Sequence, residues 1–114
     1  MTALNQLELT VTGNFLKFTS DPKLASGSRA FDKCVFTFNS AWDDFQKTAV
    51  FSVGSDEGIT AVIENGQCFV PSKCLEKAGL LRIGVIGKNG NTVISTNIIS
   101  HRISSGANDG GNII

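Results

Sequence analysis

Apolar and polar residues alternate along most of the chain with a period of two, which is typical of strands buried on one face. Leu7, Leu9 and Val11, for example, are separated by polar residues, and this alternation stops at Gly13. Comparable segments follow after short polar stretches. The pattern predicts about eight strands. They cover residues 7–12, 15–18, 33–39, 48–53, 59–63, 67–70, 80–87 and 92–103.

Turn-forming residues separate these segments. Asn65-Gly66 is the strongest hairpin signal, because both central positions of a type I′ turn have a positive φ. Residues 54–58 and 88–91 have the glycine-rich, polar composition of turns as well. Short strands joined by such turns predict an all-β fold, in the form of an antiparallel β-sandwich.

Residues 72–78 are the one segment that is predicted to be helical. Pro71 can open a helix, Ser72 can cap it and Gly79 can end it. A helix of two turns is not stable alone, so it would lie across one end of the sheets. Its core-facing residues would be Cys74, Leu75 and Ala78.

The chain of 114 residues is long enough for one domain with its own core. Residues 1–103 are predicted to form the sandwich, and residues 104–114 have the composition of a flexible linker or tail. Ile113 and Ile114 follow that linker. They fit a disordered terminus, a connection to a further segment, or an apolar contact with a neighbouring subunit.

The charges of the chain cancel, since ten basic residues stand against ten acidic ones. This balance predicts no binding to nucleic acid or to an anionic membrane surface. The first residues lack the basic segment and the apolar run of a signal peptide. No apolar stretch approaches the roughly 18 residues that a membrane helix needs.

Three cysteines, Cys34, Cys68 and Cys74, cannot all pair within one chain. We expect reduced, buried thiols in a protein made in the cytoplasm. A bridge between Cys68 and Cys74 is sterically conceivable but is not expected.

The chemically active side chains form no recognisable constellation. His101, the only histidine, lies in a predicted strand without a Ser–His–Asp pattern, and we expect it at the surface or an edge. The pairs Asp43-Asp44 and Asp56-Glu57 lie in turns, where acidic residues are common, and neighbours in an extended chain point apart. One histidine and scattered cysteines also lack the spacing of a zinc site. The sequence therefore predicts no enzyme, no cofactor and no metal site.

The single tryptophan, Trp42, has two interpretations. It could stack on a sugar ring, or it could cap the core between two sheets with its indole N–H bonded to a turn carbonyl. Phe45 lies three residues later, which favours the core cap.

Three segments carry distinctive motifs in a fixed order: FNSAWDDFQKTAVFSVG, CFVPSKCLEKAGLLRIGVIGKNG and STNIISHRISSGA. Together they resemble the N-terminal attachment domain of head-fibre, baseplate-upper and related tail proteins of phages that infect Gram-positive bacteria. The resemblance covers residues 34–107, and Ala41 departs from it where the pattern has an acidic residue. The motif positions are Trp42-Asp43, Lys47 to Phe51, Cys68 with Pro71, Gly79 to Gly87, Thr96-Asn97 and Gly106-Ala107.

The resemblance implies a non-enzymatic structural protein of the virion, made in the host cytoplasm. It implies assembly with itself, most often as a homotrimer, and docking on a capsid or baseplate protein. Such domains usually precede a fibre stem, so fibre anchor, capsid decoration and baseplate piece all stay open. The alternative function is a carbohydrate-binding module that recognises the host cell surface through Trp42.

Overall fold

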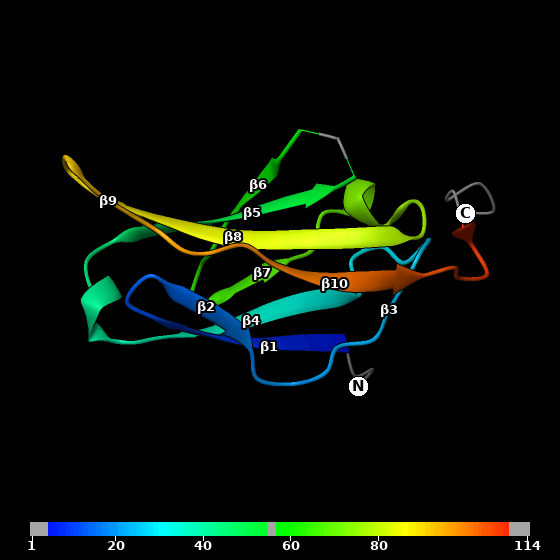
Figure 1. Ribbon diagram of the computed structural model, residues 1–114, viewed down its shortest axis with the longest axis horizontal. Helices are drawn as coiled ribbons and strands as arrows, with labels where there is room; N and C mark the ends of the chain where they lie inside the picture. The colour runs from blue at the N-terminus through cyan, green and yellow to red at the C-terminus, as the bar shows by residue number, and fades with distance from the viewer. Residues whose placement is uncertain (1–4, 55–56, 110–114) are drawn as a thin grey trace.

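The computed structural model describes residues 5–54 and 57–109, which form a sandwich of two β-sheets (Figure 1). The first sheet has the order β2–β1–β4–β7, with β1 (Asn5–Thr12), β2 (Phe15–Phe18), β4 (Asp32–Phe38) and β7 (Gln67–Phe69). The second has the order β3–β10–β8–β5–β6, with β3 (Leu24–Ala25), β5 (Gln46–Val53), β6 (Ile59–Val62), β8 (Gly79–Asn89) and β10 (Ile99–Ser104). Strand β9 (Thr92–Ser95) pairs with the far half of β8. The all-β prediction is confirmed.

The alternation of residue types marks the buried faces of the strands correctly. Leu7, Leu9 and Val11 of β1 are buried, as are Leu81 and Ile83 of β8. These side chains lie between the two sheets and belong to one continuous core. The hydrophobic effect therefore fixes which face of each strand points inward.

Two pairs of strands depart from the antiparallel pairing that the sequence predicted. β1 and β4 are parallel, and so are β10 and β3. The chain between β2 and β4 includes β3, which belongs to the second sheet. After β3 the chain returns to the first sheet, and β4 starts at the same end of that sheet as β1. A period of two is the same for both directions, so the sequence pattern could not distinguish them.

Residues 92–103 form two strands where the sequence predicted one. The chain leaves the ladder at residues 96–98, between β9 and β10. There the Thr96 hydroxyl accepts a hydrogen bond from the Val85 N–H at 2.9 Å. Asn97 Oδ1 accepts from the Leu16 N–H at 2.7 Å, and its Nδ2 donates to the Leu16 carbonyl at 3.1 Å. The Asn97 amide thus replaces a neighbouring strand at the edge of β2 and joins the two sheets.

The helix predicted over residues 72–78 is instead a 3-10 turn, η2 (Ser72–Leu75). Pro71 occupies its N-cap position and makes no side-chain capping bond. Residues 76–78 form bends between η2 and β8, which begins at Gly79. Cys74 and Leu75 are buried as expected, whereas Ala78 is exposed.

Trp42 ends a second 3-10 turn, η1 (Ser40–Trp42), and it caps the core as predicted. Its side chain is fully buried, and its indole N–H donates to the Gly13 carbonyl at 2.7 Å. The rings of Phe38 and Phe45 pack beside it, with centroids 5.1 and 6.3 Å away. The bond joins the turn after β4 to the turn between β1 and β2.

The predicted boundary after residue 103 falls inside β10, so residues 104–109 belong to the folded domain. The Gly106 N–H donates to Ser26 Oγ at 2.9 Å, and Asn108 Nδ2 donates to the Gly27 carbonyl at 3.2 Å. The Ser26 hydroxyl also bonds to the Asp109 carboxylate. Ile113 and Ile114 lie outside the described residues.

The packing of Trp42 against β8 predicts a large effect of Gly87→Ala. A Cβ at Gly87 would come within 2.5 Å of Trp42 Cζ3 and 2.9 Å of its Cε3. Because the indole is fully buried, its displacement would disturb the core, and we expect a loss of about 1–3 kcal/mol in the free energy of unfolding. Gly84→Ala is the matched control in the same strand, because its nearest contact is 3.7 Å.

Urea unfolding of both variants measures this difference. Equal stabilities for Gly87→Ala and Gly84→Ala would contradict the tight fit of the indole.

Candidate docking groove between the sheet edges

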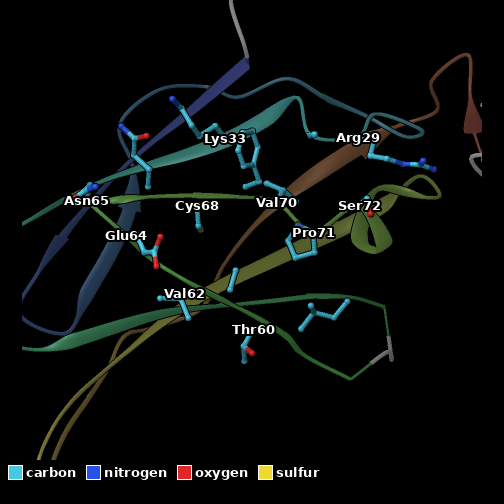
Figure 2. Close-up of a pocket in the computed structure, with 15 residues that line it drawn as sticks. Arg29, Lys33, Thr60, Val62, Glu64, Asn65, Cys68, Val70, Pro71 and Ser72 are labelled. Atoms are coloured by element: carbon cyan, nitrogen blue, oxygen red, sulfur yellow. The ribbon is translucent and has the colours of Figure 1, made fainter.

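A groove of about 710 Å³ lies between β6 and β7, the edge strands of the two sheets (Figure 2). The two strands diverge from the turn at Asn65 and Gly66, whose φ angles of 53° and 75° confirm the predicted hairpin turn. Glu64 and Gln67 close this turn with two backbone hydrogen bonds of 3.0 Å. Beyond them each strand joins a different sheet, which opens the groove.

The backbone of β6 offers hydrogen-bonding groups to this groove. The Ile63 N–H donates to the Lys47 carbonyl, which makes this opposite pair a hydrogen-bonded one. Because hydrogen-bonded and non-hydrogen-bonded pairs alternate in an antiparallel ladder, the N–H and C=O groups of Thr60 and Val62 point away from β5. In residues 5–54 and 57–109, no strand pairs with that outer edge.

The facing edge of β7 has the same property. The Val70 N–H donates to the Asp32 carbonyl, and the Phe36 N–H donates to the Gly66 carbonyl. Because hydrogen-bonded pairs alternate along the ladder of β4 and β7, the pair at Cys68 is hydrogen-bonded and the pair at Phe69 is not. The backbone groups of Phe69 therefore point away from β4. The groove thus lies between two strand edges that are open within the described part of the chain.

The side chains around the groove suit contact with another chain. Val62 is 60% exposed and Phe69 is 43% exposed. The sequence of β6, Ile-Thr-Ala-Val, contains none of the charged residues or prolines that usually protect an exposed edge strand. Arg29 and Lys33 lie along one side of the lining, and Glu64 lies near the turn. This arrangement can bind an extended segment through its backbone and through apolar side chains.

The remaining candidate residues that the structure describes lie apart from one another. His101 lies in β10, where its Nε2 is 3.4 Å from Asp21 Oδ1 and its ring packs edge-on to Phe18. Asp43 and Asp44 are exposed around the turn that follows η1. Within the described ranges, no three His, Cys, Asp or Glu side chains lie close enough together to hold a metal ion. Asp56 lies outside these ranges.

The burial of Trp42 contradicts its interpretation as a glycan contact. The side chain has no exposed surface, so neither face of the indole can stack on a sugar ring. Its N–H is also engaged by Gly13. The sequence already favoured this outcome, since Phe45 follows at a spacing that places both rings in one cluster.

Asp32 is a buried carboxylate that the sequence interpretation missed. It is 2% exposed, and its Oδ1 accepts a bond of 2.7 Å from Asn5 Nδ2. Its Oδ2 is buried and finds no hydrogen-bond partner among the described residues. The signal was its position two residues before Cys34, on the inward face of β4.

No family model matches the chain, and no curated protein matches it. The helical turns of residues 5–54 and 57–109 are both too short to cross a membrane.

Asp32→Asn should change how stability depends on pH. Burial raises the pKa of Asp32 in the folded protein, and the bond from Asn5 opposes this with a smaller effect. The unfolded chain therefore ionises first as the pH rises above about 4, and the wild type loses stability until the folded carboxyl ionises too. Asp32→Asn, which cannot ionise, should gain stability relative to the wild type over that window. Urea unfolding at a series of pH values tests this, and parallel pH profiles would contradict it.

Proposed function

We propose that the chain is a non-catalytic structural domain of a bacteriophage virion, which assembles with itself and docks on a capsid or tail baseplate protein. The virion would be its location, and the host cytoplasm its place of synthesis. The observation that carries the docking role is the exposed, apolar and unprotected edge of β6 beside the groove. Edge strands of this kind bind other chains by extending their sheet.

The motifs behind the phage resemblance support the proposal because they coincide with the contacts that hold this sandwich together. Trp42 fills the space between the sheets, and Gly87 leaves room for its ring. Asn97 holds the edge of β2 through two hydrogen bonds. A family that shares these positions would share the fold, and fibre anchor, capsid decoration and baseplate piece are all roles for it.

Assembly through β6 could give either of two oligomers, which differ in mass. A twofold dimer would pair β6 with β6 of the second copy, since the same surface is used on both subunits. In a cyclic trimer, β6 of each copy would instead meet a different surface of the next copy. The resemblance favours the trimer.

The carbohydrate-binding alternative has lost the residue on which it depended, because Trp42 is buried. No other tryptophan or tyrosine exists in the chain. We therefore propose no glycan site.

Val62→Lys should weaken the proposed self-association. A lysine on this edge strand opposes pairing with another strand, because its charge would have to be desolvated. Val93→Lys is the matched control, since Val93 of β9 is 57% exposed against 60% for Val62. We expect light scattering on a sizing column to give an oligomer, most simply a trimer, for the wild type and Val93→Lys, and a monomer for Val62→Lys.

Thr60→Pro tests the backbone part of this contact. Its N–H points to the outer edge, so proline there removes a donor without breaking the pairing of β6 with β5. An unchanged oligomer in both Thr60→Pro and Val62→Lys would exclude β6 as the contact. A monomeric wild type would contradict self-assembly itself.

A further inference from the structure

We propose that Cys34 and Cys68 are a site of reversible oxidation, where a disulfide bond joins β4 to β7 next to the docking groove. The proposal is independent of the virion role. It rests on the placement of two cysteines opposite each other in adjacent strands, and on the access that the groove gives to one of them.

The two residues are direct partners in the antiparallel ladder of β4 and β7. The backbone bonds of Val70 to Asp32 and of Phe36 to Gly66 lie two positions to either side. Cys34 and Cys68 therefore form a hydrogen-bonded pair, for which the Cα atoms are typically about 5.5 Å apart. That separation is close to the most common value for disulfides. Both side chains are buried and thus point to the same face of the sheet.

The groove gives an oxidant access to one of the two thiols. Cys68 is part of the groove lining, and its side chain extends into the space between β6 and β7 (Figure 2). It is 9% exposed, whereas Cys34 is completely buried. Cys68 is therefore the thiol that a small reagent reaches first, and Cys34 is the thiol that resolves the product.

The reaction balances with a low-molecular-weight disulfide such as glutathione disulfide as the oxidant. The Cys68 thiolate attacks one sulfur of the reagent, which forms a mixed disulfide and releases one small thiol. The Cys34 thiol then loses its proton, attacks the Cys68 sulfur and displaces the second small thiol. The protein loses two electrons and two protons, and the reagent gains both.

The hydrogen bond between the two thiols supports this order of events. It lowers the pKa of Cys68, against the opposing effect of burial. The same bond, together with burial, raises the pKa of Cys34. The pair therefore loses its first proton from the more accessible sulfur. Because the thiolate is the reactive form, oxidation should become faster as the pH rises.

The disulfide bond would restrain β7, the strand that forms one side of the groove. β7 is three residues long and pairs with β4 alone in the described residues. A covalent link between its central residue and β4 would oppose its local separation from the sheet. Oxidation would thereby fix one wall of the docking groove.

The test is to oxidise the folded protein with glutathione disulfide and to count the remaining thiols by alkylation and mass spectrometry. The wild type should fall from three reactive thiols to one. Cys74→Ser should form the same bridge, whereas Cys34→Ser and Cys68→Ser should form no intramolecular bridge. The thermal midpoint of the oxidised wild type should rise by several degrees and return to its starting value with a reducing agent.

Peptide mapping of the oxidised wild type identifies the bridge even if a serine variant fails to fold. A Cys34–Cys68 peptide supports the proposal. A Cys68–Cys74 peptide, or three unmodified cysteines after exposure of the native protein, would overturn it.

Discussion

The indole of Trp42 is the contact on which the closure of the sandwich depends. It fills the space between the sheets without any exposed surface, and its N–H is satisfied by the Gly13 carbonyl. Strand β8 can run past it only because Gly87 has no side chain there. One hydrogen bond and one steric fit thus hold a turn of the first sheet against the longest strand of the second. A buried aromatic side chain stabilises the fold through the apolar area that it buries, and the hydrogen bond of its N–H fixes its orientation.

Side-chain hydrogen bonds join the two sheets at other places, and the sheets separate between β6 and β7. Asn97 substitutes for a missing strand at the edge of β2, and Ser26 connects the segment after β10 to the loop after β3. At the β6–β7 side, the tight turn at Asn65 links the sheets through the two backbone hydrogen bonds between Glu64 and Gln67. The backbone groups beyond this turn point outward, so the open edge follows from the way the rest of the sandwich is closed.

Much of the fold could be predicted from the sequence, because burial on alternate residues is a local signal. The same signal carries no information on strand direction, so the parallel pairing of Leu7 with Cys34 was missed. Nor does it reveal contacts between distant residues: the bonds of Asn97 to Leu16 break a predicted strand in two. The groove could not be predicted at all, since it depends on which strands are left at the edges. Trp42 was interpreted correctly because its aromatic neighbour is close in sequence.

The outer edge of β6 is open in the free protein, and we propose that it becomes covered on assembly. Amide hydrogen exchange by NMR tests it directly at three neighbouring residues. We predict fast exchange of Thr60 and Val62 in dilute, monomeric protein and protection of both in the assembled state. Ala61, whose N–H faces β5, should be protected in both states. Protection of Thr60 and Val62 in the monomer, or their equally fast exchange in the assembly, would show that the outer edge of β6 is not the surface covered on assembly.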